Sequence, residues 1–302
     1  MKSLKKIILA GLIMVLSLTF FTTQVPAYEL QKKYIAADAQ WLIHLDFKTF
    51  IKTRLWDNIY REKKIKIDHK NDHFLKEVRF DVLKDLYSVT IYGVDKGDKN
   101  AVVLINGVFN IKKVVEKLKS EEKTEISKYG KVKVYHWNDD DYGAFVGSDL
   151  LIITHSRMNM EYAIDVVMGK KKGFKGSALS KRMKEVPGDA ILFALAGDIS
   201  KMIGKHRKMP MMIDNSKMAL FLAMERNNDL KLSLKLHTES PEAAKNLMQV
   251  GNGLLALARM SGEKMEGKEK LINSINITAD RNIVNAKMFI PSDFIIKNID
   301  KH

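Results

Sequence analysis

Two histidines four residues apart, His69 and His73, are the side chains best placed in the sequence to bind a metal ion. If this segment is helical, both imidazoles share one face, because residues four apart lie about one turn from each other. The acids Asp68, Asp72 and Glu77 could add oxygen ligands, and imidazole with carboxylate suits zinc. The pair lacks the glutamate that follows the first histidine in metalloprotease helices. A surface helix or loop is the simpler interpretation, and a metal-binding protein or metal-dependent hydrolase using His69 and His73 is the alternative.

Two further segments carry possible metal ligands. The clustered oxygens of Asn138–Asp141 could hold calcium, but the glycine and the distant glutamate of a calcium-binding loop are missing, so a hairpin loop is the simpler interpretation. Four methionines between positions 202 and 212 surround His206, and thioether sulfur favours Cu(I). Basic residues crowd that segment, and the chain uses 16 methionines in all, which favours adaptable packing over a copper site.

The remaining histidines form no recognisable catalytic set. His44 lies in an alternating apolar segment and is expected either on the less buried side of a strand or as the cap of a loop. His136 and His155 each end a strand-like segment, and Ser156 follows His155, but a catalytic triad depends on geometry and not on adjacency. The sequence has no phosphate-binding loop, dinucleotide fingerprint, nucleophile elbow or HExxH motif. We therefore predict no catalytic residue and no cofactor, and we favour a non-enzymatic protein.

The N-terminus has the three parts of a cleavable export signal, over residues 1–27. Lysines near the start precede an apolar run over residues 7–21, and the segment ends in Val-Pro-Ala. Small residues before the cut suit a signal peptidase, so cleavage after Ala27 is expected. The apolar run is shorter than the ~20 residues of a membrane-spanning helix, which makes an uncleaved membrane anchor the less favoured alternative. No later run approaches that length. A soluble mature chain without a transmembrane span should begin at Tyr28, in the periplasm or outside the cell.

The composition excludes cysteine chemistry and indicates the charge of the partners that the chain could bind. The chain has no cysteine, so disulfides, thiolate metal sites and a lipidated cysteine are excluded. Its net charge is +15, and loss of the three signal-peptide lysines leaves +12. Such a field favours an anionic partner such as acidic polysaccharide or phospholipid headgroups, although a solvated lysine-rich surface is the simpler interpretation. The expected partner is therefore a protein or an anionic cell-envelope component. Nucleic acid is disfavoured, because aromatic residues lie mostly inside apolar strand patterns instead of beside the basic ones.

An internal repeat organises the elements that must position these side chains. Residues 36–51 and 187–203 both contain Asp-Ala, an apolar strand, an aspartate and the start of an apolar-periodic helix. The second aspartates, Asp46 and Asp198, stand where helix N-caps belong, because a carboxylate there accepts a bond from a free amide of the first turn.

The similarity continues downstream of these segments. Residues 87–119 and 218–249 each read as a strand, a polar turn, a second strand and an amphipathic helix. The turns at 95–98 and 226–229 consist of residue types that tolerate left-handed backbone. Ser240 is a good cap for the second helix, because a proline follows it in the first turn.

Each half then ends in further strands and a last helix. Strands are expected at 132–137, 143–146, 150–154, 272–278 and 283–290, and helices at 158–168 and 291–298. The fold class is therefore α+β, with two similar units of antiparallel sheet whose helices pack on one face.

The expected domain organisation follows from this repeat. A signal peptide (1–27) precedes a first unit (28–168), a linker or loop region (169–185) and a second unit (186–302). The stretch 169–176, rich in glycine and lysine, is expected to be flexible and solvated.

The chain resembles a loose group of uncharacterised exported bacterial proteins. The matching pieces are Ala37-Asp38-Ala39, the strand Val89–Gly93 and the second-copy dipeptide Asp189-Ala190. The resemblance covers most of the mature chain and implies a duplicated α+β unit. Its motifs are structural, and the group has no activity that could be transferred to this chain.

Overall fold

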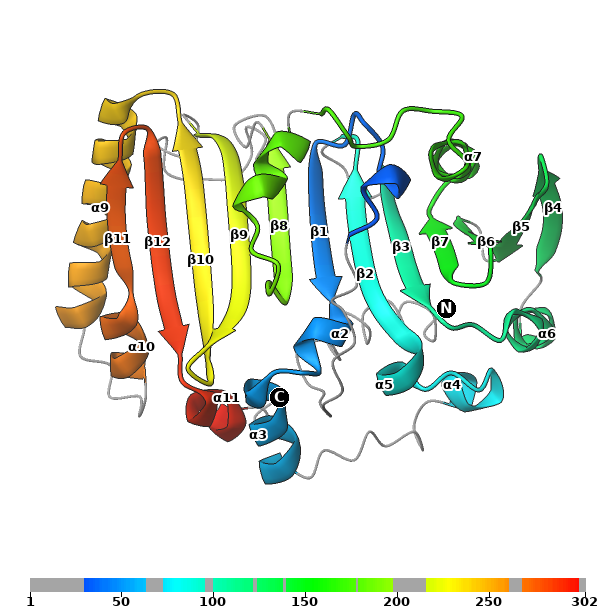
Figure 1. Cartoon of the computed structure of the whole chain (residues 1–302), viewed down its shortest axis with the longest axis horizontal. Coiled ribbons are helices and arrows are strands. Elements are labelled where there is room, and N and C mark those ends of the chain that lie inside the picture. Colours follow the sequence, from blue (N-terminus) through cyan, green and yellow to red (C-terminus); the bar gives the residue numbers. More distant parts are fainter. Residues whose placement is uncertain are drawn as a thin grey trace. The chain divides into compact units, whose positions relative to one another are not determined.

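The computed structural model describes residues 30–63, 73–95, 100–121, 124–137, 140–177, 179–197, 216–260 and 268–298. The chain divides into two compact units, Met1–Lys181 and Arg182–His302. Each contains an antiparallel sheet with helices packed against it, which confirms the predicted α+β class (Figure 1). The limits of the domains and their origin by duplication stay predictions. The export signal lies outside the described residues.

Among the described residues of the first unit, seven antiparallel strands form a sheet in the order β1-β2-β3-β7-β6-β5-β4. In chain order they are β1 (Trp41–Asp46), β2 (Leu86–Gly93), β3 (Ala101–Gly107), β4 (Glu125–Tyr129), β5 (Val132–Trp137), β6 (Asp141–Val146) and β7 (Leu150–Thr154). The strands expected at 132–137 and 150–154 are confirmed. Alternate residues of the central strands are buried, among them Leu42, Tyr92, Leu104 and Ile152, as the period of two in a strand requires.

Several helices of the first unit begin after residues that cap them. They are η1 (Lys32–Tyr34), α2 (Phe47–Phe50), α3 (Arg54–Lys63), α4 (His73–Glu77), α5 (Val82–Asp85), α6 (Ile111–Glu121) and α7 (Arg157–Val167). Asp46 caps α2 as predicted, because its carboxylate accepts the amide of Thr49 at 2.8 Å. Ser156 caps α7 by accepting the amide of Asn159 at 3.1 Å.

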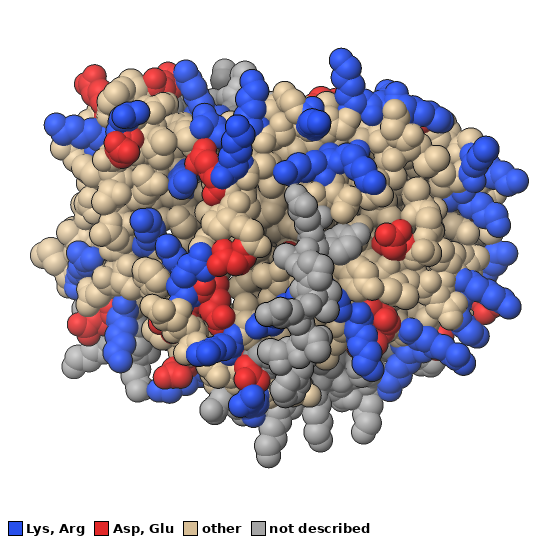
Figure 2. All heavy atoms as spheres, viewed as in Figure 1, with Lys and Arg blue, Asp and Glu red and all other residues tan. Residues whose placement is uncertain are grey.

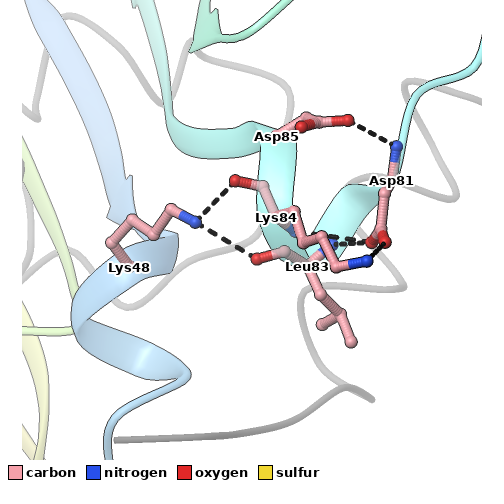
Figure 3. Close-up of polar contacts among 5 residues, drawn as sticks. All are labelled: Lys48, Asp81, Leu83, Lys84 and Asp85. Carbon is pink, nitrogen blue, oxygen red and sulfur yellow. Dashed lines mark hydrogen bonds and ion pairs between the residues drawn. The ribbon is translucent and has the colours of Figure 1, made fainter. Parts of the chain in front are cut away.

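A lysine joins two of the short helices (Figure 3). Nζ of Lys48, on α2, donates to the backbone oxygens of Leu83 and Lys84 on α5, at 3.2 and 2.7 Å. The last carbonyls of a helix have no partner within it, so a cation there satisfies them. Burial lowers the pKa of Lys48, and the carboxylates of Asp85 and Asp81 oppose that change. This contact fixes α2 against α5 and has no catalytic geometry.

The loop after α7 packs against the start of the first unit. Gly173 forms a β-bridge with Ala36, and the amide of Phe174 donates to the backbone oxygen of Lys32 at 3.2 Å. The Phe174 ring is fully buried. This part of the predicted solvated stretch is therefore a packed loop, held in place by one aromatic side chain that the surrounding lysines and glycines obscure in the sequence.

In the described part of the second unit, five antiparallel strands form a sheet in the order β8-β9-β10-β12-β11. The strands are β8 (Leu192–Gly197), β9 (Ser216–Arg226), β10 (Asp229–Thr238), β11 (Asn276–Asp280) and β12 (Ile283–Ile290), and the helices are η3 (Ser180–Glu185), α9 (Pro241–Met260), α10 (Lys268–Ser274) and α11 (Ser292–Asn298). Asn227 and Asn228 have φ of 54° and 70°, which makes the tight β9–β10 turn that the sequence predicts. Ser240 accepts the amide of Ala243 at 3.1 Å and caps α9, as expected.

The strand expected at 272–278 is wrong in its first part. Helix α10 continues to Ser274, and β11 begins only at Asn276. Lysine and glutamate beside the apolar pair Leu271-Ile272 favour helix. The Ser274 hydroxyl ends the helix by donating to the backbone oxygen of Leu271 at 2.7 Å, and its oxygen accepts the amide of Phe289 on β12 at 3.1 Å.

The two units share a strand arrangement. In each, three strands form a meander, a helix follows, and the last strand returns beside the third: β7 beside β3, and β12 beside β10. The repeated Asp-Ala dipeptides also form the same turn. The amide of Ala39 donates to Ala36 and that of Ala190 to Pro187, both at 3.2 Å, and both Ala39 and Ala190 are buried.

Candidate functional site

The predicted metal pair lies largely outside the described residues. His69 is not among them, and His73 is described only as the first residue of α4. The pair therefore stays a prediction. Within the part of the chain that the structure describes, no three histidine, aspartate or glutamate side chains gather as a metal site would require. The methionine-rich segment around His206 also lies outside the described residues.

The structure brings together Asp141 and His155, which the sequence separates. Tyr142 of β6 pairs with Thr154 of β7, and Asp141 and His155 lie one residue beyond that pair, at the end of these two strands. An Asp141 oxygen lies 2.7 Å from Nδ1 of His155, with the Asp141 side chain 11% and the His155 side chain 40% exposed. A buried carboxylate orients a half-exposed imidazole in this way in acid–base sites. Ser156 caps α7 instead of joining this pair.

A short polar chain lies at the same end of the sheet. The side chain of Asn159 on α7 donates to Asn100 at 3.0 Å, and Asn100 in turn hydrogen-bonds to Asp95. The backbone oxygen of Asp95 accepts the indole N–H of Trp41 at 2.9 Å. These bonds fix the start of β3 to α7 and β1. The polar side chains that make them therefore have a structural role.

His44 is buried, contrary to the expectation that it faces the less buried side. It lies opposite Thr90 in the β1–β2 pair, is 3% exposed, and its Nδ1 is 2.8 Å from Thr90 Oγ1. Burial lowers the pKa of His44 to about 4. A neutral, hydrogen-bonded imidazole inside the core is a structural group and not an accessible acid or base.

Basic side chains are spread widely over the surface. Lysine and arginine occur over the whole face drawn in Figure 2, with acidic side chains among them. This view agrees with the lysine excess of the sequence. The basic side chains are not concentrated in one part of this face, whereas the strand register does bring several of them together.

One face of the second sheet gathers basic groups in register. Lys231, Lys235 and His237 alternate along β10 and therefore share a face. Lys287 of β12 lies opposite Ser233 of β10 and shares that face too. We call these four basic residues, with Arg182 of η3, the basic face. Asp280 of β11 stands at its His237 end, opposite Ile283.

An aromatic ring lies at the other end of the basic face. Phe289 pairs with Lys231 across β10 and β12, and Lys231 Nζ is 5.9 Å from the ring centroid. The ring is 38% exposed. Helix α9 packs on the opposite face of the sheet, since Gly251 of α9 approaches Ile277, whose partner Ala286 alternates with Lys287. Helix α9 therefore does not cover the basic face, on which Lys287 is exposed, Lys231 and Lys235 are partly exposed and His237 is buried.

Glu185 of η3 lies against the basic face. Its two oxygens lie 3.2 Å from Nη1 of Arg182, 3.0 Å from Nζ of Lys235 and 3.8 Å from Nε2 of His237. Burial alone would raise the pKa of the Glu185 carboxyl, but the hydrogen bond from Lys235 and the nearby cations hold it below its usual value. Burial, together with Arg182 and Lys235, lowers the pKa of His237 despite Glu185.

The sequence contains a signal for this face. Residues 230–237 alternate leucine with lysine, serine, lysine and histidine, which predicts a strand with one apolar and one basic face. The contribution of Glu185 could not be found in this way, because it lies 50 residues from Lys235.

No family model and no curated protein matches the chain. Solved structures do resemble it: crystal forms III, I and IV of TP0453, each with 9% sequence identity. Their TM-scores are 0.52, 0.51 and 0.53, and the similarity covers 93%, 91% and 89% of this chain and 100%, 98% and 95% of TP0453. At this identity the likeness concerns the fold alone. The resemblance to a group of exported proteins stays a prediction.

Proposed function

We propose that this chain is an exported, non-enzymatic protein whose second unit binds an anionic component of the cell envelope. The observation that carries the proposal is the basic face, where Lys287 of β12 lies diagonally between Lys231 and Lys235 of β10. Like charges on one face repel one another, and an anionic partner relieves the part of that repulsion that Glu185 does not neutralise. The positive net charge of the chain also attracts an anionic partner at long range.

Export rests on the N-terminal segment. Its basic start, apolar run and Val-Pro-Ala end suit cleavage after Ala27. N-terminal sequencing of the protein recovered from the envelope or medium should therefore begin at Tyr28. A product that keeps Met1 would contradict export by cleavage.

Binding is tested with two anionic probes, a carboxylated polysaccharide on a column and vesicles that contain an anionic phospholipid. The double substitution Lys231→Glu with Lys287→Glu should weaken retention strongly, since each lysine near an anionic surface contributes about 1 kcal/mol. Lys245→Glu with Lys270→Glu, on α9 and α10, changes the net charge equally and is the matched control. Retention on one probe alone identifies the source of the anionic groups.

None of the described helices combines the length and the hydrophobicity needed to cross a bilayer.

Helix α9 exposes Val250, Leu254, Leu257 and Met260 along its C-terminal half. Nothing among the described residues covers these side chains, and the proposal does not depend on them.

A further inference from the structure

Three basic groups from two elements converge on one carboxylate at the edge of the basic face. Arg182 comes from η3, and Lys235 and His237 come from β10. All three lie within 4 Å of the oxygens of Glu185, at the distances given above. Arginine and lysine together carry one positive charge more than Glu185 neutralises. The cluster therefore still attracts an anion when Glu185 is in place.

His237 adds a polar atom that Glu185 does not satisfy. Its Nε2 is buried and has no hydrogen-bond partner among the described residues, because 3.8 Å from Glu185 is too long for a hydrogen bond. Buried polar atoms are nearly always hydrogen-bonded in folded proteins. An oxygen brought closer than that of Glu185 would supply the missing partner.

Glu185 is well placed to be exchanged. It is the last residue of η3, a six-residue 3-10 helix, and its side chain is 23% exposed. The Arg182 side chain is 42% exposed, so solvent reaches the cluster from the η3 side. A short helix has few internal hydrogen bonds to hold such a residue in one position.

We propose that Arg182, Lys235 and His237 form a binding site for a carboxylate group of an acidic polysaccharide, and that Glu185 occupies it as an internal competitor. This inference rests on the proposed function and names its ligand chemistry. A carboxylate fits, because it is the group that already fills the site and because a planar guanidinium pairs with it well.

The rest of the basic face favours a polymer over a single anion. Lys231 and Lys235 are four residues apart on β10, which is about 13 Å along a strand. One carboxylate cannot reach both, whereas a chain that carries carboxylates at intervals can. Phe289 beside Lys231 offers an exposed ring against which a sugar could stack.

The test compares binding of a polyuronate by the wild-type chain and by Glu185→Gln at fixed salt. Removing the internal competitor should tighten binding about tenfold, which is the size of one charge-assisted hydrogen-bond pair. Glu242→Gln, on the first turn of α9, makes the same change of net charge away from the site and should have little effect. Adding Lys235→Gln to Glu185→Gln should remove the gain.

The outcomes separate this inference from the proposed function. Equal effects of Glu185→Gln and Glu242→Gln, with salt-sensitive wild-type binding, would overturn the internal competitor and leave the function standing. No wild-type binding at low salt would overturn the function itself. Tighter binding of polyglutamate than of polyuronate would overturn the assignment to a polysaccharide. If Glu185→Gln unfolds at a lower temperature than the wild-type chain, Glu185→Asp is the second variant, because it keeps the charge but shortens the side chain. It should still tighten binding of the polyuronate. Unchanged affinity of Glu185→Asp would overturn the inference.

Discussion

His44 and Thr90 lie opposite each other on β1 and β2, and their hydrogen bond of 2.8 Å holds a neutral imidazole inside the first unit. Their partnership is decided by tertiary structure, because 46 residues separate them in the chain. It also makes the stability of this unit sensitive to pH.

Lowering the pH should destabilise the first unit before its carboxylates titrate. The pKa of His44 is about 4 in the folded chain and 6.5 in the unfolded one, so the unfolded state takes up the proton first. The free energy of unfolding should therefore fall by about 2 kcal/mol between pH 7.5 and pH 5. Urea unfolding at several pH values measures this loss. The variant His44→Gln should lose less over the same interval, and an identical loss in both proteins would contradict the role of His44.

Gly143→Ala should destabilise the first sheet. A Cβ at Gly143 would lie 2.5 Å from the Trp137 ring, and that ring is 4% exposed and cannot move aside freely. Overpacking of this kind costs about 1–3 kcal/mol. Gly188→Ala is the control, because a Cβ there meets no atom within 4 Å. Thermal unfolding of both variants checks the prediction, and equal melting temperatures would contradict the packing of Trp137.

Adjacent leucines on α9 should differ in their contribution to stability. Leu255 is 8% exposed and Leu254 is 59% exposed. Leu255→Ala should cost about 2–4 kcal/mol through lost burial and a cavity, whereas Leu254→Ala should change the free energy of unfolding by less than about 0.5 kcal/mol. Chemical denaturation of the two variants tests which side of α9 faces the sheet. A larger loss for Leu254→Ala would show that its side chain is covered.

The sequence predicted those features that local chemistry determines. Asp46 and Ser240 are predictable as caps, because the hydrogen bond of a cap joins it to an amide only three residues later. The asparagines of the β9–β10 turn were recognised for the same reason, since left-handed backbone selects few residue types.

Features that depend on distant residues were missed or misassigned. Both faces of β1 carry apolar side chains, so alternation alone could not show that His44 faces the core. Apolar residues at 271–272 suited a strand or a helix, and packing against β12 selected α10. The Glu185 cluster joins a loop-like helix to a strand 50 residues later, and no spacing rule links them.

The metal interpretation of His69 and His73 is tested by elemental analysis of protein purified without a histidine tag. We expect less than one equivalent of zinc per chain, because the favoured interpretation of this pair is a surface helix or loop. One equivalent that disappears in the double variant His69→Ala with His73→Ala would contradict this expectation and establish the metal-binding alternative.

The most direct measurement is the salt concentration that elutes the wild-type chain and its two double variants from an anionic polysaccharide column. Binding through the basic face predicts much earlier elution of Lys231→Glu with Lys287→Glu than of Lys245→Glu with Lys270→Glu. Equal elution of the two variants would contradict it, because only the net charge would then matter.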